Sequence, residues 1–238
     1  MSSLSIVLPA YNEEENVEQA VEHVSEVAQT LERDYEILLV NDGSSDRTGE
    51  IGRDLEDRVP RFRLVEHYPN RGYGGALKAG FDAATKDLIA FYPADAQFDF
   101  GEVTRLLKPV ERENADIVCG YRVDRQDNFV RRLNGWGWNM VVRLLFGYLC
   151  RDIDCGFKLF RREVLDHVNI GSDGAMIDTE FLAKAKARGF RIAEAPLTHL
   201  PREAGEATGA NLPVIIKAFR DLIRFRLRLS RELREEDQ

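Results

Sequence analysis

Short runs of apolar residues alternate with amphipathic stretches through the first half of the chain. Apolar runs that end at polar clusters are typical of strands buried on both faces. Stretches in which apolar residues recur with helical spacing predict the helices between them. The predicted strands cover residues 4–8, 37–40, 62–65, 88–92 and 117–119, and the predicted helices cover residues 16–31, 46–55, 74–84 and 102–113. This alternation predicts an α/β fold with a mostly parallel central sheet and helices on both faces.

The second half of the chain is less regular. Residues 128–149 mix arginine, tryptophan and glycine with apolar side chains. Residues 157–160 and 191–195 are candidate strands, and residues 178–188 are a candidate helix. Because no internal repeat or low-complexity linker interrupts the chain, we expect one domain over residues 1–210 and a helical tail over residues 211–238.

The composition narrows the class of protein. The chain has 238 residues, with 33 Lys and Arg against 41 Asp and Glu, and a net charge of −8. Apolar residues make up 44%, which excludes a disordered chain, and the acidic balance disfavours a nucleic-acid binder. No apolar run reaches about 18 residues, so we expect no membrane-spanning helix. The strand pattern begins at Leu4 and leaves no room for a signal peptide, and the three cysteines lack zinc spacing, so we expect a reduced, cytoplasmic protein.

The first polar cluster, residues 9–13, follows the first predicted strand. Tyr11 offers a ring face for a nucleobase, and Glu13 offers a carboxylate. Equally, Asn12 can cap a helix whose first turn is complemented by acidic residues. Spacing alone leaves both interpretations open.

The second cluster ends the second predicted strand. Asp42 stands where a carboxylate can accept the imino N–H of a nucleobase, whereas Ser44 and Asp46 are typical of a turn that starts the next helix. In parallel sheets, ligands bind beyond the carboxyl ends of the strands, and both clusters fall there.

The third cluster, residues 70–80, is rich in glycine and opens a predicted helix. Glycines at this place let backbone N–H groups approach a phosphate, and a helix N-terminus favours an anion. Arg71 and Lys78 add positive charge. The dinucleotide-binding fingerprint is not met, because Leu77 occupies the third glycine position, and a P-loop is not met either.

The fourth cluster, residues 92–99, follows another apolar strand. Asp95 and Gln97 should therefore project at the edge of the sheet. A cation such as Mg²⁺ takes oxygen ligands and shares them with substrate phosphates. The alternative is a solvated turn in which Asp99 caps a helix.

These four segments, in this order, resemble the family 2 glycosyltransferases of the GT-A fold, and within them the dolichyl- or polyprenyl-phosphate sugar synthases. The resemblance covers nearly the whole chain, roughly from Leu4 to Phe225. It implies a Rossmann-like nucleotide-binding half followed by an acceptor half. It also implies that a nucleotide-sugar donor is bound by Pro9, Ala10, Tyr11, Glu13, Asp42, Asn70, Lys78, Ala94 and Asp95.

The resemblance further implies a divalent metal, Mg²⁺ or Mn²⁺, at Asp95 and Gln97. The family usually carries Asp-Ala-Asp in this segment, whereas this chain carries Pro93-Ala94-Asp95. One carboxylate is missing, so we expect weaker metal binding.

Arg122 and Arg202 are implied as the groups that approach the phosphates of the donor or the acceptor. Many relatives have Ser-Lys in the segment after Arg202, where this chain has Thr208-Gly209, so charge neutralisation would rest on the two arginines. Asp178 occupies the place where several members of the family hold a catalytic carboxylate. It is open whether Asp178 acts as a base for a hydroxyl acceptor, positions the acceptor or only starts a helix.

The implied activity is an inverting transfer of a hexose from a donor of the GDP-mannose or UDP-glucose type to a polyprenyl or dolichyl phosphate, as in a mannosyltransferase. Two alternatives stay open: transfer to a saccharide hydroxyl, and a non-catalytic nucleotide-sugar-binding protein of the same fold. We expect no nucleic-acid partner. The candidate protein partners are a second copy of this chain, in a homodimer, and an integral membrane protein.

The tail predicts a basic amphipathic helix that lies either on the cytoplasmic membrane surface or against the domain or a partner chain. Its apolar positions are Leu212, Ile215, Phe219, Leu222 and Ile223, and its basic positions are Lys217, Arg220, Arg224, Arg228 and Arg231. A second aromatic and basic group forms either an acceptor-side lip that faces lipid or part of the core: Trp136, Trp138, Phe146 and Tyr148, with Arg131, Arg132 and Arg143.

Overall fold

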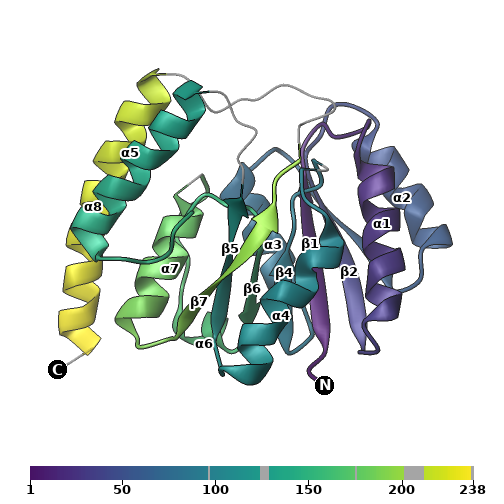
Figure 1. Ribbon diagram of the computed structural model, residues 1–238. Helices are drawn as coiled ribbons and strands as arrows, with labels where there is room; N and C mark the ends of the chain where they lie inside the picture. Colours follow the sequence, from purple (N-terminus) through teal and green to yellow (C-terminus); the bar gives the residue numbers. More distant parts are fainter. Residues whose placement is uncertain (96, 124–128, 175, 201–211, 237–238) are drawn as a thin grey trace.

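Seven strands form one sheet at the centre of the computed structural model, which describes residues 1–95, 97–123, 129–174, 176–200 and 212–236 (Figure 1). The strand order is β3-β2-β1-β4-β6-β5-β7, and all neighbours are parallel except that β6 runs antiparallel to β4 and β5. The mostly parallel α/β sheet predicted from the sequence is confirmed. The strands are β1 (Leu4–Ala10), β2 (Tyr35–Asp42), β3 (Phe62–His67), β4 (Leu88–Phe91), β5 (Ile117–Val123), β6 (Lys158–Arg161) and β7 (Ile192–Thr198).

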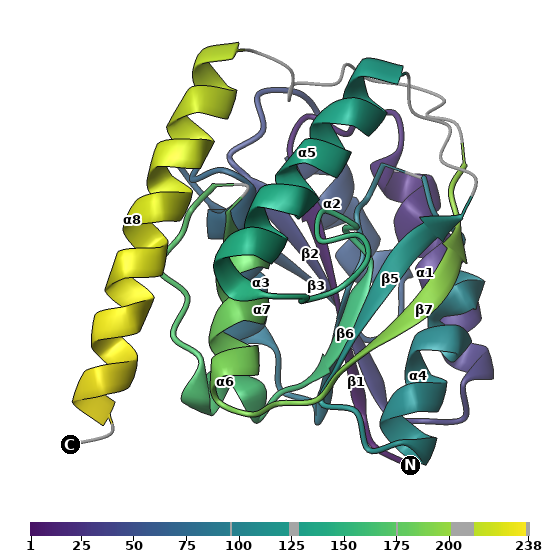
Figure 2. The same ribbon diagram turned by 60° about the vertical axis from the view of Figure 1, so that its left-hand side comes forward.

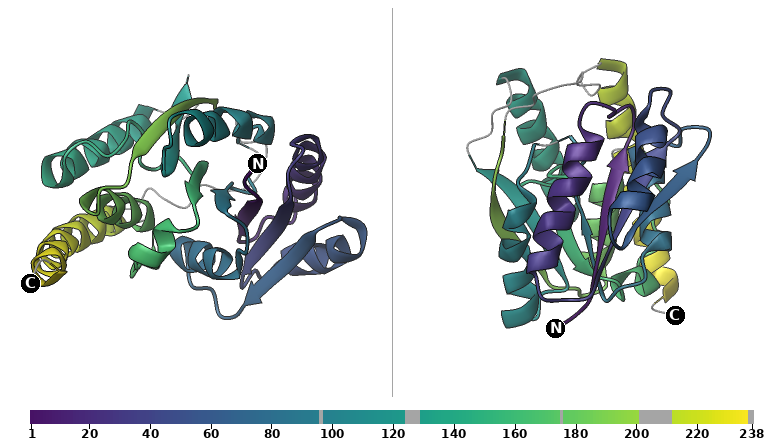
Figure 3. Two further views of the ribbon diagram at one scale, coloured as in Figure 1. Left: turned by 90° about the horizontal axis from the view of Figure 1, so that it is seen from below. Right: turned by 90° about the vertical axis from the view of Figure 1, so that its right-hand side faces the viewer.

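Helices cover both faces of the sheet, with α1 and α4 on one side and α3 and α7 on the other (Figure 3). Each face has its own apolar core, because side chains alternate along every strand. In β1, Leu4, Ile6 and Leu8 enter the first core and Val7 enters the second. The helices are α1 (Val17–Thr30), α2 (Thr48–Arg58), α3 (Tyr73–Ala83), α4 (Val103–Arg112), α5 (Phe129–Phe146), α6 (Val164–His167), α7 (Ile177–Ala187) and α8 (Leu212–Glu236), with a short 3-10 helix η1 (Phe100–Glu102).

Two elements of the second half differ from a simple alternation of strand and helix. Residues 129–146, to which the sequence assigned no element, form the single helix α5. β6 enters the sheet between β4 and β5 in the opposite direction. The loop that precedes β6 therefore crosses the carboxyl edge of the sheet, where Gly120 N–H donates to the Phe157 carbonyl over 3.0 Å.

Helix α8 packs on α5 and α7 (Figures 1 and 2). Leu222, Phe225 and Leu229 are buried in the second core, and the Phe225 ring stacks on Phe146 with centroids 5.3 Å apart. In its described part, the helix thus uses one apolar face for packing. Ile223 does not share this face, because 55% of its surface is exposed. Among the helices that the structure describes, none has the length and apolar character needed to cross a membrane.

Candidate active site

The loops after β1 and β2 are fastened to each other at the carboxyl edge of the sheet. The Asn12 N–H donates to Ser44 Oγ over 3.0 Å, and its side-chain oxygen accepts from the Ser45 N–H over 2.8 Å. The Glu13 N–H donates to Thr48 Oγ1 over 2.9 Å. Because α1 begins only at Val17, Asn12 is not its cap, and the amide instead ties the two loops into one wall.

The residues predicted to hold a nucleoside lie along this wall. Pro9 and Ala10 end β1, and Tyr11 follows with 49% of its surface exposed, so its ring is open to a ligand. Glu13 forms part of the same loop and accepts from Asn16 Nδ2 over 2.8 Å.

Asp42, the last residue of β2, is buried with 3% of its surface exposed. Its Oδ1 accepts from the Arg71 N–H over 2.7 Å and lies 3.2 Å from His67 Nδ1. Asn70 Nδ2 donates to the Asp42 carbonyl over 2.9 Å. The structure therefore brings the predicted residues Asp42 and Asn70 together, and His67 is a neighbour that the sequence did not indicate.

The glycines at the start of α3 do not form an open phosphate cradle. The N–H groups of Gly74 and Gly75 donate to the Asp173 carbonyl over 2.9 Å and 3.3 Å. A Cβ on Gly74 would lie 2.7 Å from the Asp173 carbonyl carbon, so glycine is needed here for the approach of another loop. Lys78 is also engaged, in an ion pair with the Asp173 carboxylate. In this structure these two N–H groups are therefore occupied by the chain itself, and phosphate binding at this helix start stays a prediction.

Asp95 lies beyond the end of β4, and its Oδ1 accepts from the Gln97 N–H over 3.2 Å. Its neighbour Ala94 is buried. The same region holds the hydroxyl of Tyr73, the first residue of α3, whose pKa is raised by burial and then by acidic neighbours. Those neighbours include Asp178, Asp95 and Asp154. The charges of three carboxylates from distant segments thus act on one tyrosine, and two of these carboxylates were predicted from the sequence.

Asp178, the second residue of α7, forms a buried ion pair with Lys158 of β6. The Lys158 Nζ lies 2.6 Å from Asp178 Oδ1 and also donates to the Cys155 carbonyl. Burial raises the pKa of Asp178, and the positive charge of Lys158 opposes this rise. Burial works against the charge of Lys158, but the nearby Asp178 keeps its pKa above the usual value.

Arg122, near the end of β5, is held by Asp152 in a two-point contact. The Arg122 Nε and Nη2 lie 2.7 Å and 2.8 Å from the two carboxylate oxygens of Asp152. Asp154 lies two residues further along this loop. Desolvation, followed by the charges of Asp178 and Asp152, raises the pKa of Asp154 to about 6. Asp154 was not among the residues predicted from the sequence, because nothing local shows which charges it will meet.

The remaining predicted residues lie near this edge or outside the described residues. The Gln97 carbonyl accepts from the Leu200 N–H over 2.9 Å, which brings the end of the β7 segment beside the Asp95 loop. Arg202, Thr208 and Gly209 lie outside the described residues.

The side chains at this edge suit a metal ion only if the substrate supplies further oxygen ligands. Within the described part of the chain, no three His, Cys, Asp or Glu side chains are grouped so that they could bind a metal ion. Mg²⁺ at nucleotide sites commonly uses one or two carboxylates together with substrate phosphates and water. Asp95 at the open edge fits that arrangement. Pro93 packs beside Gly156: a Cβ added to Gly156 would lie 3.4 Å from the ring of Pro93.

Two bacterial proteins with sequence similarity to this chain carry names that refer to polyprenyl phosphates. The chain is 31% identical over 204 residues to the dodecaprenyl-phosphate galacturonate synthase of Rhizobium johnstonii, with 85% of this chain and 60% of that protein covered. It is 34% identical over 209 residues to the undecaprenyl-phosphate 4-deoxy-4-formamido-L-arabinose transferase of Enterobacter sp., with 86% and 62% covered. The chain thus spans about 60% of the length of these relatives.

Solved structures of the same architecture include glucosyl-3-phosphoglycerate synthase from Mycobacterium tuberculosis in complex with Mn²⁺, uridine diphosphate and glucosyl-3-phosphoglycerate. That match has a TM-score of 0.71 at 21% identity and covers 96% of this chain and 80% of the other. The likeness confirms the GT-A fold. Residues 5–168 match the family described as Glycosyl transferase family 2. The chain belongs to this glycosyltransferase family.

Proposed function

We propose that this protein transfers a sugar from a nucleotide-sugar donor to a polyprenyl phosphate, with inversion at the anomeric carbon. Family membership supports sugar transfer, and the names of two relatives support the lipid phosphate acceptor. The structural observation that carries the choice of acceptor is the buried Lys158–Asp178 pair. A hydroxyl acceptor needs a base, and Asp178 is enclosed in an ion pair, whereas a phosphate acceptor is already anionic.

The nucleoside end of the donor is assigned to the wall formed by the first two loops. The exposed ring of Tyr11 can stack on a base, and the Asp42 carboxylate can accept a base N–H. Pro9, Ala10 and Glu13 line the same wall, and Asn70 fixes the backbone of Asp42. These loops are already joined by hydrogen bonds in the free protein, so little ordering is needed when the donor binds.

The diphosphate end is assigned to the edge beside Asp95. A divalent ion held by Asp95 and the diphosphate would offset the charge that grows on the leaving group, as Mn²⁺ or Mg²⁺ accompanies uridine diphosphate in structural neighbours. Arg122 is proposed as a preoriented hydrogen-bond donor to the diphosphate, because Asp152 holds its guanidinium in place while offsetting its charge. Arg202 is proposed for the same task from the family resemblance.

In the proposed reaction, a phosphate oxygen of the lipid attacks the anomeric carbon from the face opposite the nucleotide. The bond between the anomeric carbon and the diphosphate oxygen breaks as the new bond forms. The nucleoside diphosphate leaves with the electron pair, and the configuration inverts. The protein supplies alignment of the two reactants and preorganised charge at the leaving group.

A saccharide hydroxyl is the second candidate acceptor, and Asp154 is the observation that favours it. With a pKa raised to about 6, this carboxylate is suited to accept a proton near neutral pH. Under this alternative, Asp154 would be the base and its removal would abolish transfer.

The choice between these functions can be tested with purified protein, a panel of nucleotide sugars and two kinds of acceptor. The panel should include GDP-mannose and UDP-glucose, and also uronate and amino-pentose donors in view of the relatives' names. Mass spectrometry would identify the products with Mg²⁺ and with Mn²⁺. Transfer to short polyprenyl phosphates supports the proposal, and transfer only to saccharides favours the second candidate. Binding of a nucleotide sugar without any turnover would indicate a non-catalytic nucleotide-sugar-binding protein.

Contact with an anionic membrane surface is part of the proposal, because a polyprenyl phosphate is a membrane lipid. Arg220, Arg224 and Arg231 are exposed on α8 beside the exposed Ile223 and Leu227. Basic residues near an anionic surface contribute roughly 1 kcal/mol each. Co-sedimentation with anionic vesicles at low salt should be observed, and its absence would remove this part of the proposal.

A further inference from the structure

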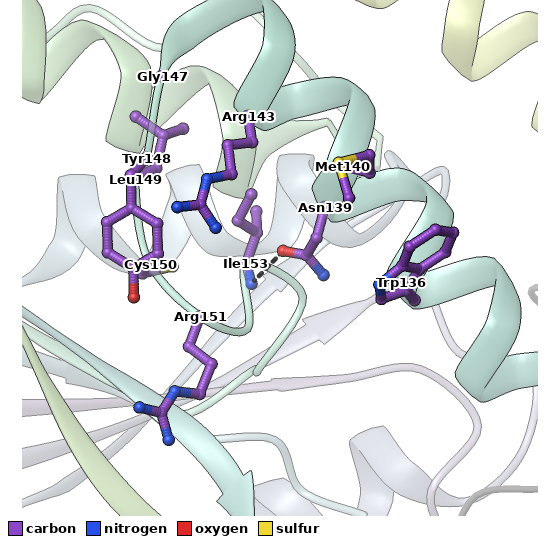
Figure 4. A pocket seen from close by; sticks show the side chains of 10 residues that line it. All are labelled: Trp136, Asn139, Met140, Arg143, Gly147, Tyr148, Leu149, Cys150, Arg151 and Ile153. Carbon is purple, nitrogen blue, oxygen red and sulfur yellow. Dashed lines mark hydrogen bonds between the residues drawn. The ribbon is translucent and has the colours of Figure 1, made fainter.

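A cavity of about 330 Å³ lies between α5 and the loop that follows it, residues 147–153 (Figure 4). One end is basic and aromatic, with Arg143, Tyr148 and Arg151. The other end is formed by Trp136 and Met140 on successive turns of α5 (Figure 4). None of the residues that line this cavity was assigned to the donor site above.

The two arginines at the basic end have spare hydrogen-bonding capacity. The Arg143 guanidinium carbon lies 4.9 Å from the centre of the Tyr148 ring, and that of Arg151 lies 4.2 Å from the Tyr121 ring. Stacking fixes each guanidinium plane and leaves its N–H edges available. Among the residues that the structure describes, neither guanidinium forms an ion pair, and both residues are exposed.

Glu194 is the carboxylate bound at this end, and it forms no ion pair with the guanidinium of Arg143 or Arg151. Glu194 of β7 accepts from the Tyr148 hydroxyl with one oxygen and from the backbone N–H of Arg151 with the other. The two arginines outnumber the one carboxylate, so this end of the cavity keeps a net positive charge. The contacts of Glu194 fix the positions of Tyr148 and of the loop.

The apolar end continues onto the surface of α5. Trp136, Met140 and Leu144 follow at intervals of four residues and are exposed by 62%, 49% and 84%. Trp138 and Phe146, by contrast, are partly buried against the core. The predicted aromatic lip is therefore divided, with Trp136 and Tyr148 open to solvent and the other two rings packed.

The charge of this side of the molecule is opposite to that of the rest. Residues 129–151 and 212–236 carry eleven of the 33 Lys and Arg residues but four of the 41 Asp and Glu residues. These segments form α5, its following loop and α8, which packs on α5. An anionic ligand is thus attracted to this side of an otherwise acidic protein.

The cavity also adjoins the candidate active site through its own loop. Asn139 Oδ1 on α5 accepts from the Ile153 N–H over 3.3 Å, which attaches the loop to the helix. Ile153 is flanked by Asp152, which holds Arg122, and by Asp154. The loop that carries these acids therefore also lines the cavity, through Arg151 and Ile153.

We propose that this cavity receives the phosphate and the adjoining isoprenoid units of the acceptor lipid, with Arg143 and Arg151 at the phosphate and Trp136 and Met140 along the chain. This assignment rests on the proposed function, since it names the acceptor's entry site. The recognised chemistry is an anionic phosphate joined to an apolar chain, and neither part alone satisfies both ends of the cavity.

Binding of a lipid phosphate to the cavity can be measured by the fluorescence of one tryptophan, Trp136. The chain has two tryptophans, so a Trp138→Phe variant leaves Trp136 as the sole reporter. Titration with farnesyl phosphate should shift the Trp136 emission to shorter wavelength and saturate. Farnesol and inorganic phosphate are the two control probes, and each should bind at least about tenfold more weakly because each lacks one half of the ligand.

Steady-state kinetics tests the two arginines. In an Arg143→Gln/Arg151→Gln variant, the KM for a short polyprenyl phosphate should rise about tenfold or more, while the KM for the donor should change by less than about twofold. A variant with lysine at both positions should recover part of the loss, because charge returns without the planar fork. Arg112→Gln, an exposed site at the end of α4, is the matched control.

Equal farnesyl phosphate binding by the reporter protein with and without the two arginines would overturn the assignment, as would binding of farnesol as tight as that of farnesyl phosphate. A protein that transfers sugar to a lipid phosphate with an unchanged acceptor KM in the double variant would also overturn it, while the proposed function would stand. If Trp136 reports saturable binding but no sugar is transferred to any lipid phosphate, the proposed function fails and the binding site stands.

Discussion

The Lys158 Nζ lies 2.6 Å from Oδ1 of Asp178, and both side chains are almost completely buried. A lysine in the middle of a sheet and an aspartate in the first turn of a helix thereby stabilise each other's charge. Neither group would stay charged alone at this depth, because desolvation of a single ion costs several kcal/mol. The pair joins β6 to α7.

Removal of Lys158 should therefore destabilise the protein strongly. Lys158→Met leaves Asp178 as a buried charge without its partner, and we expect the free energy of unfolding in urea to fall by about 3–5 kcal/mol. A Lys158→Met/Asp178→Leu variant, which removes both charges, should regain most of this loss. A single variant as stable as wild type would show that the pair does not stabilise the fold.

Asp154 should make the stability depend on pH in the opposite direction to an ordinary paired carboxylate. Its pKa is about 6 in the folded protein against an ordinary value of 3.8. The folded state thus holds this proton more tightly than the unfolded chain does, so its stabilising contribution is present at low pH and is lost as pH rises through about 6. At about pH 7.5, Asp154→Asn should raise the Tm by roughly 2 °C, and the gain should disappear towards about pH 4.

Asp87 offers a control of opposite sign for this measurement. Hydrogen bonds from the backbone and hydroxyl of Ser3 lower its pKa. Its contribution is therefore present at neutral pH and lost in acid, so Asp87→Asn should lower the Tm at neutral pH. If both variants changed the Tm in the same direction at neutral pH, the assigned environment of Asp154 would be wrong.

Asp95 should be the most sensitive single carboxylate for turnover under the proposed function. Asp95→Ala removes the side chain assigned to the diphosphate and its ion, and we expect kcat to fall by about 10²–10³-fold. EDTA should lower the rate of the wild-type protein, and Mg²⁺ or Mn²⁺ should restore it. Asp99→Asn, in the same loop, is the control, because the Asp99 carboxylate faces His23 and the Gly101 N–H. A near-normal rate for Asp95→Ala would contradict the assignment.

The sheet and the ends of its strands could be predicted from the sequence because they depend on local patterns. Buried parallel strands read as short apolar runs, and polar residues such as Asp42 and Asp95 follow where the runs stop. The direction of β6 could not be predicted in this way. A four-residue strand carries no sign of its orientation, and its buried Lys158 looks like a break in an apolar run until its partner is known.

The contacts that shape the candidate site join residues far apart in the sequence. Arg122 meets Asp152 across 30 residues, and the charges of Asp95 and Asp178 act on Tyr73 although the three residues come from separate segments of the chain. Helix α5 escaped prediction because glycines and arginines interrupt its apolar period, while packing of Val142 and Phe146 against the core supports it. Local patterns thus located the edge, and the partners of each charge came from the tertiary fold.

The glycines at the start of α3 allow a final prediction that separates packing from ligand binding. A Cβ on Gly74 would lie 2.7–2.9 Å from backbone atoms of Ser172 and Asp173, which cannot move aside as a flexible side chain can. Gly74→Ala should therefore lower the free energy of unfolding by about 1–3 kcal/mol. Gly137→Ala, on α5 with nothing within 4 Å, is the matched control and should stabilise the protein by about 0.5–1 kcal/mol. Urea unfolding of both variants and the donor KM separate the two roles of Gly74. A stable Gly74→Ala protein with a raised donor KM would show that the helix start binds the donor phosphate. A destabilised Gly74→Ala protein supports the packing contact with the loop before α7.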